Sequence, residues 1–288
     1  MAKANGHPAL AITNTGNLFN AYYFYKECNA AGVKPIFGEE FYMVPSDDMR
    51  TDKSKQGQLY RVVVLAMNQV GWKTLVKLSS AAFVEGHHYV PRIDRATLEG
   101  HKEGLLVMAP GLRSDIGNLW LAGDEKQALR LAQWYREAFP NFCLEIVPHS
   151  NIEQVQFNHF VASMAGSDGF KLVAGNNCRY LRADQARYYD YLLMLKAKKK
   201  KADYQRRTPL DHHFKTRVEM ERGLLAQRFD STLVAGWLDE SGRIAEAVEP
   251  VVFDKSFKLP VFDNTPVEID IKQVPKEAEE EDLLAGVQ

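Results

Sequence analysis

Short apolar runs alternate with longer segments of helical periodicity from residue 9 to residue 196, and this alternation constrains the fold more than any other feature. The helical segments place apolar residues on one face, as at Leu75, Leu78 and Ala82. Repeated βα units predict an α/β fold with parallel strands covered by helices, in a barrel or an open sheet. The expected strands are ALAI (9–12), KPIFGEEFYMV (34–44), LYRVVVLAM (59–67), GLLVMA (104–109), FCLEIV (142–147) and FKLVAG (170–175), and the expected helices span 17–30, 69–83, 125–138, 151–165 and 183–196.

The pattern changes along the chain, and we divide it into three regions. Residues 1–208 are expected to form the barrel, and residues 209–249, which show helical periodicity only, a helical appendage. Residues 250–288 read as an extended linker followed by an acidic tail, because this stretch is Pro-bearing and then rich in Glu.

Composition excludes several classes of protein. The 288 residues are 45% hydrophobic and carry 36 basic against 37 acidic residues, so the chain supports a sizeable core and has no global bias toward nucleic acid. Cys28, Cys143 and Cys178 are too widely spaced for a disulfide framework or a zinc knuckle. No apolar run reaches membrane-spanning length and the first residues lack the apolar core of a signal peptide, which leads us to expect a cytoplasmic protein.

Candidate catalytic residues are sparse. The histidines form no H-x-H or H-x-x-x-H pair, so we expect them to lie at the surface or to serve packing. Glu39, Glu40 and Glu145 lie in strands, where a carboxylate is a ligand or general base if it meets a partner and otherwise a hydrogen-bonded or solvated group. G-x-S-x-G, Walker A and G-x-G-x-x-G motifs are absent, so no nucleotide cofactor is indicated.

One basic run, KAKKKKADYQRR at 196–207, is a candidate nucleic-acid contact. Its cations could follow a phosphate backbone while Tyr204 and the arginines stack on bases. A solvated loop after a helix explains the same residues equally well. The basic residues are Lys196, Lys198, Lys199, Lys200, Lys201, Arg206 and Arg207.

Several long motifs, in order, resemble the PHP (polymerase and histidinol phosphatase) domain of the bacterial replicative DNA polymerase III alpha subunit. They are GHPALAITNTGNLFNAYYFYKECNAAGVKPIFGEEFYM, LAMNQVGWKTLVKLSSAAFVEGHHYVPRID, GLLVMAPGLRSDI, CLEIVPHS and LVAGNNCRYL, and the similarity extends from residue 2 to about residue 262. The resemblance implies a distorted (β/α)7-type PHP barrel that lacks its first βα unit in this chain and is followed by C-terminal helices. A barrel opened in this way exposes two strand edges, so we expect the chain to be marginally stable or to pair with another polypeptide.

The resemblance also implies a site that has lost its metal. Members that bind manganese or zinc hold it with His, Asp, Glu and Cys ligands, whereas here only Glu40 retains a ligand type. Arginine at two of these positions opposes a cation and can pair with Glu40 instead. No metal or other cofactor is therefore expected. The corresponding positions are Asn14, Thr15, Glu40, Arg61, Gly111, Asn177 and Arg179.

Three functions remain open on this basis. The first is a non-catalytic structural and docking module in DNA replication, with a polymerase core on another chain, a proofreading exonuclease subunit and DNA as partners. Although the family is that of DNA-directed DNA polymerases, the polymerase catalytic core is absent from this chain, so it is expected to be inactive alone. The second is an active metal-dependent phosphoesterase or 3'-5' exonuclease, which would need Mn or Zn. The third is a nucleic-acid-binding module that uses the basic run at 196–207.

Overall fold

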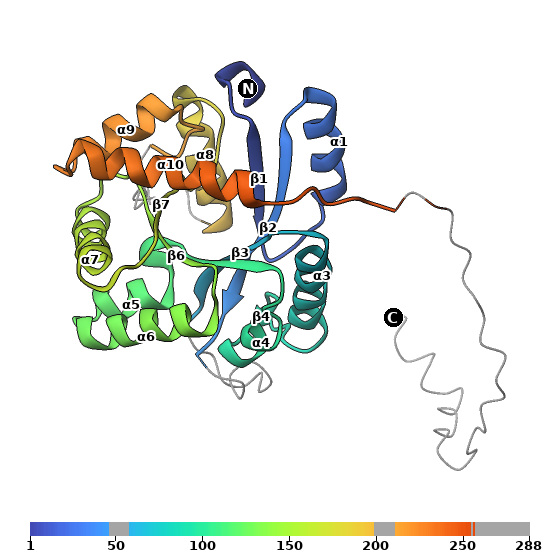
Figure 1. The fold of residues 1–288 in the computed structure, drawn as a ribbon, viewed down its shortest axis with the longest axis horizontal. Helices are drawn as coiled ribbons and strands as arrows, with labels where there is room; N and C mark the ends of the chain where they lie inside the picture. Colours follow the sequence, from blue (N-terminus) through green and yellow to red (C-terminus); the bar gives the residue numbers. More distant parts are fainter. Residues whose placement is uncertain (46–57, 199–210, 255, 257–288) are drawn as a thin grey trace, which may run out of the picture. The chain divides into compact units, whose positions relative to one another are not determined.

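The computed structural model describes residues 1–45, 58–198, 211–254 and 256 (Figure 1). The chain divides into a unit over Met1–Val252 and a segment over Phe253–Gln288, and every helix and strand below belongs to the first unit. None of the helices in the described ranges is long and apolar enough to cross a membrane.

A curled, seven-stranded sheet organises the first unit (Figure 1). The strands follow the order β1-β2-β3-β5-β6-β7, and the short β4 pairs with the end of β2. This mixed α/β architecture, with its half-barrel sheet, confirms the fold expected from the resemblance. The strand bounds are β1 (Ala9–Thr15), β2 (Lys34–Met43), β3 (Tyr60–Ala66), β4 (Arg92–Ile93), β5 (Leu105–Ala109), β6 (Phe142–Ile146) and β7 (Leu172–Ala174).

The directions of the strands depart from the all-parallel expectation. The pairs β1/β2, β2/β4, β5/β6 and β6/β7 are parallel, but β3 runs antiparallel to both of its neighbours, β2 and β5. The expectation was wrong at β3 because a strand buried on both faces reads as a continuous apolar run whichever way it points. Val62, Val64 and Leu65 illustrate this, since all three are buried.

The helices predicted from periodicity are all present; the one expected at 125–138 has the predicted bounds, and the others have shifted ends. The segment expected at 151–165 continues to Asp168, and the one expected at 183–196 begins with a 3-10 turn, η3 (Ala183–Gln185). Several short helical elements of seven residues or fewer were missed. The bounds are α1 (Ala21–Ala31), α3 (Gln69–Val84), α4 (Arg95–Gly100), α5 (Asp115–Leu121), α6 (Glu125–Ala138), α7 (Ile152–Asp168), α8 (Ala186–Lys196), α9 (Arg217–Leu225) and α10 (Ser231–Ala247), with further 3-10 turns η1 (Lys3–Asn5) and η2 (Gly111–Arg113).

The two faces of the sheet carry different cores. On β2, Phe41 belongs to the larger core, which includes residues of α3, α5, α6 and α7, whereas Ile36 belongs to a smaller core on the inner face. The C-terminal end of α10 and the turn after it close that inner core, because Val248 packs within it. Two hydrogen bonds fix this placement: Lys34 Nζ donates to the carbonyl of Ala245 (2.7 Å), and the N–H of Glu249 donates to the carbonyl of Met67 (2.8 Å).

Replacing Gly71 with alanine is expected to destabilise the fold by about 3 kcal/mol. Gly71 lies in the first turn of α3, where an added Cβ would stand 1.9 Å from the carbonyl oxygen of Gly104, so the two backbones would have to separate. Urea unfolding measures the difference. Gly166→Ala in α7 is the matched control: nothing lies within 4 Å of its Cβ position, so this change is expected to stabilise by up to about 1 kcal/mol. Equal stability of the two variants would contradict the close approach.

Candidate functional site

A cavity of about 980 Å³ lies on the inner face of the sheet. The lining includes the end of β1, the middle of β2 and β6, the loop that follows β7 and the turn before α9. Five of the positions singled out by the resemblance line this cavity, so the fold brings these five together. They are Asn14, Thr15, Glu40, Asn177 and Arg179.

Glu40 is the centre of this group, and both of its carboxylate oxygens are engaged. The hydroxyl of Thr15 donates a 2.9 Å hydrogen bond to Oε1, and Arg61 Nε lies 3.6 Å from the same oxygen. Arg113 Nη1 forms an ion pair with Oε2. Since Glu40 is buried, these contacts replace the water that the carboxylate would otherwise bind.

The arginines reach Glu40 from two directions. Arg61 enters from β3, and its guanidinium also stacks on the ring of Tyr42, 3.8 Å from the ring centroid. Burial lowers the pKa of Arg61, while the negative charge of Glu40 raises it and the nearby Arg113 and Arg179 lower it. Arg113 enters from η2, two residues after Gly111. Gly111 itself is buried, and its Cβ position lies 3.2 Å from the side chain of Gln154 rather than in the cavity lining.

A second carboxylate, Glu145, lies beside this group. The pKa of Glu145 is raised to about 7, chiefly by burial in β6. The positive charge of Arg113 opposes this shift, and the negative charge of Glu40 adds to it. Gly175, directly after β7, makes room for this side chain, because a Cβ there would stand 1.9 Å from Glu145 Oε1. The site thus pairs two carboxylates with cationic guanidinium groups.

The loop after β7 is held by the segment that precedes α9. The carbonyl of Asn177 accepts a hydrogen bond from His212 Nδ1 (2.9 Å), and the N–H of Arg179 donates to the carbonyl of His212 (2.8 Å). Asn176 donates from Nδ2 to the carbonyl of His213 and accepts from Lys215 Nζ (3.3 Å). Asn177 and Arg179 are therefore fixed at the cavity by hydrogen bonds to His212, which is distant in the chain.

These positions do not fit a metal of the kind that the resemblance implies. A guanidinium carries donors only and no lone pair for a cation, and the amides of Asn14 and Asn177 are poor ligands for transition metals. The one carboxylate among them, Glu40, already has both oxygens bound by cations or a hydroxyl.

Sequence reasoning missed two features of this region. Arg113 gave no signal because its partner Glu40 is 73 residues away. His149 and His212 were expected to be surface or packing residues, and both are buried, but they meet each other and Asp211 at one point. Of the basic run, Lys196 ends α8 and Lys198 follows it, whereas Lys199, Lys200, Lys201, Arg206 and Arg207 lie outside the described residues.

The comparison with protein families decides the assignment. The family model of the PHP domain matches residues 1–149, which is more than half of the 288-residue chain. The chain belongs to the PHP domain family. The resemblance found in the motifs is thereby confirmed, and the part of the cavity lining up to Glu145 lies within the matched residues.

Curated relatives extend the match beyond residue 149. The PHP domain chain is 32% identical over 263 residues to the DNA polymerase III subunit alpha of Deinococcus radiodurans, covering 88% of this chain and 19% of that protein. The same subunit of Treponema pallidum is 35% identical over 207 residues, or 70% of this chain and 18% of the relative. The same subunit of Thermus aquaticus is 32% identical over 266 residues, which cover 88% of this chain and 21% of the relative. The chain thus spans about a fifth of the length of these relatives.

Proposed function

We propose that this PHP domain is a non-catalytic structural and docking module of a DNA polymerase III alpha-type polymerase and serves in DNA replication. The observation that carries the proposal is the state of Glu40, whose oxygens are bound by Arg61, Arg113 and Thr15. These contacts stand where the family resemblance implies a metal, and they supply positive charge without a metal.

Chemistry gives the reason for a non-catalytic role. Metal-dependent hydrolysis of a phosphoester relies on an ion that polarises the phosphate and lowers the pKa of a bound water. Arginine can attract a phosphate but cannot generate hydroxide from water at neutral pH, because its guanidinium stays protonated. Glu145, with a pKa of about 7, would have to act without that partner. The contacts of Glu40 with Arg61, Arg113 and Thr15 therefore suit a structural role better than catalysis.

The proposed partners follow from the relatives. Similarity to DNA polymerase III alpha subunits covers 88% of the chain in Deinococcus radiodurans, so we propose a polymerase core on another chain and a proofreading exonuclease subunit as partners, in the cytoplasm. Mixing the full chain with the proofreading exonuclease subunit of the same organism should give a one-to-one complex by size-exclusion chromatography with light scattering. Separate elution at tens of micromolar would remove the exonuclease from the proposal.

An activity measurement tests the non-catalytic role. The full chain, purified without chelators, is expected to release no phosphate from p-nitrophenyl phosphate and no nucleotide from single-stranded DNA, with or without added Mn²⁺ or Zn²⁺. Glu40→Gln is the control, since it removes the one retained ligand type. Turnover in the parent chain that Glu40→Gln abolishes would establish a working phosphoesterase instead; turnover that survives the change would point to a contaminant.

A further inference from the structure

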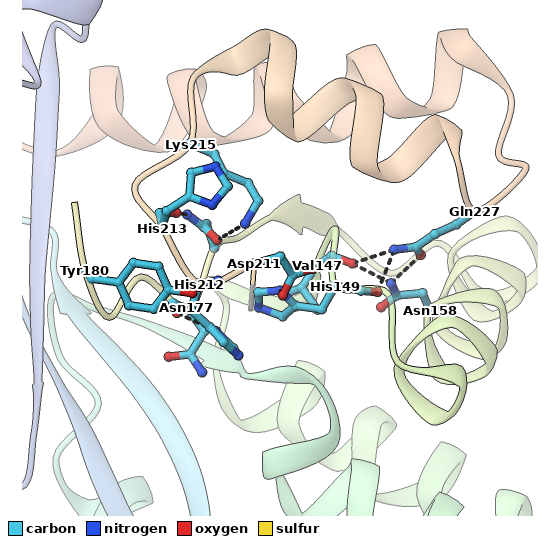
Figure 2. A network of polar contacts seen from close by, with 11 residues as sticks. Val147, His149, Asn158, Asn177, Tyr180, Asp211, His212, His213, Lys215 and Gln227 are labelled. Atoms are coloured by element: carbon cyan, nitrogen blue, oxygen red, sulfur yellow. Dashed lines mark hydrogen bonds and ion pairs between the residues drawn. The ribbon is translucent and has the colours of Figure 1, made fainter. Parts of the chain in front are cut away.

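Two segments of the chain meet beside the loop that follows β7, and together they contribute three side chains able to bind a metal (Figure 2). His149 follows β6, while Asp211 and His212 precede α9. One ligand atom from each lies within 4.8 Å of the others, and the two imidazole rings are 4.2 Å apart between centroids. None of the three belongs to the group around Glu40.

Hydrogen bonds fix the orientation of both imidazoles. His212 Nδ1 lies 2.9 Å from the carbonyl oxygen of Asn177, which can only accept, so Nδ1 carries the proton. His149 Nδ1 lies 3.0 Å from Asp211 Oδ1, and an ionised carboxylate likewise only accepts. Both rings therefore direct an Nε2 lone pair away from these anchors when neutral. This is the arrangement found in histidines that ligate metals, where the other ring nitrogen donates to a carboxylate or a backbone carbonyl.

The lone pair of His149 Nε2 meets no partner within the part of the chain that the structure describes. His149 is 5% exposed, and its Nε2 is buried without a hydrogen bond to any of the described residues. A buried polar atom that is left unpaired costs free energy, and a bound ion is one of the explanations for such an atom. This unpaired Nε2 is therefore a position at which an ion can bind.

Protonation does not compete with a metal at this point. Burial and, to a smaller extent, the neighbouring His149 together lower the pKa of His212 to about 4, so His212 is neutral at physiological pH. Although burial favours the neutral acid, the hydrogen bond from His149 and the charges nearby lower the pKa of Asp211. Neutral imidazole and ionised carboxylate are the forms that bind metals.

The backbone that carries His149 is held rigidly. Gln227 Nε2 donates to the carbonyls of Val147 and His149, at 3.1 Å each, and Asn158 Nδ2 donates to Val147 and to Gln227 Oε1, at 2.7 Å each (Figure 2). All three of Asn158, Gln227 and His149 are buried. A site on a fixed backbone loses little conformational entropy when an ion binds.

We infer that His149 and His212 form a binding site for one divalent transition-metal ion, held by the Nε2 atoms of both histidines, while Asp211 orients His149 through its Nδ1–H. Two imidazoles suit Zn²⁺ and its neighbours, with the remaining positions open to water. Ligand atoms around tetrahedral zinc are roughly 3.3 Å apart, so binding draws the side chains together from their present spread. The ion would tie the loop after β6 to the segment before α9.

Cobalt titration of the tag-free full chain tests the site. One equivalent of Co²⁺ should bind and give the visible absorption of a low-symmetry site, and Zn²⁺ should displace it and raise the melting temperature. His149→Gln and His212→Gln are each expected to weaken binding at least 100-fold. His213→Gln is the matched control, because His213 neighbours the cluster in sequence but its Nε2 lies 3.4 Å from Glu219. Glu40→Gln should also leave binding unchanged.

A second measurement needs no variant and so does not depend on whether the variants fold. In ¹⁵N spectra of the histidine side chains, Zn²⁺ should shift the Nε2 resonances of two histidines only. Absence of binding by the folded parent chain would overturn the inference, as would one equivalent that survives both His149→Gln and His212→Gln. Loss of binding in Glu40→Gln would move the metal to the other site and overturn it equally.

Discussion

Replacing Glu39 with methionine is expected to raise the free energy of unfolding by about 4 kcal/mol at pH 8.5 and to leave it nearly unchanged at pH 4.5. Glu39 is 0% exposed and lies on β2 next to the buried Glu40, but its side chain is not part of the charged group. Burial raises the pKa of Glu39 from 4.5 to about 8, and the hydroxyl of Ser79 opposes the shift only in part. Methionine has a similar length and carries no charge to desolvate.

The sign of the pH dependence follows from proton binding. Between pH 4.5 and about 8 the folded chain keeps a proton on Glu39 that the unfolded chain releases. Below pH 4.5 Glu39 is protonated in both states and does not lower the free energy of unfolding of the parent chain. As the pH rises from 4.5 toward 8, that free energy falls by up to about 1.4 kcal/mol for each pH unit. Urea unfolding from pH 4.5 to 8.5 measures it. The exposed Glu137 on α6 supplies the control, since Glu137→Met should show no such slope. A difference between Glu39→Met and the parent that stays constant with pH would refute the explanation.

Local patterns were sufficient to predict most of the fold. Each predicted strand and helix is present because a short continuous apolar run reflects a strand buried on both faces, and an apolar period of 3.6 residues reflects a helix buried on one face. The direction of β3 was not predictable, since direction depends on pairing with β2 and β5, and these contacts are non-local. The 3-10 turn η2 was missed for a similar reason: three residues contain no full period.

The candidate site was predictable only as far as motifs reached. The motif alignment placed Glu40, Asn177 and Arg179 together, and they do line one cavity. The contact of Arg113 with Glu40 joins residues 73 positions apart, and His149 and His212 are about 60 positions apart. Local sequence spacing does not predict contacts over such separations. The tertiary structure determines which groups lie next to a buried charge. The sequence alone therefore identifies the carboxylate of Glu40 but not Arg113, the cation that neutralises it.

Replacing Arg113 with methionine is expected to destabilise the PHP domain by about 2 kcal/mol at pH 8. Among the described residues, Glu40 would keep Arg61, at 3.6 Å, and the hydroxyl of Thr15 as partners. The magnitude is below that of a fully buried pair because the side chain of Arg113 is 32% exposed. Removing Arg113 also takes away the charge that lowers the pKa of Glu145, so that pKa rises above its present value of about 7. The loss should grow as the pH rises through this range and shrink toward pH 4.5.

A double-mutant cycle identifies the interaction. Glu40→Gln removes the carboxylate that Arg113 neutralises, so the double variant should be less destabilised than the sum of the single changes, by about 1 kcal/mol or more. The exposed Arg130→Met on α6 should cost little, which separates the ion pair from the general loss of an arginine. Additive effects would mean that Arg113 does not neutralise Glu40. Strong coupling would support the view that arginine supplies the positive charge in this PHP domain, because the carboxylate then depends on the guanidinium for its stability.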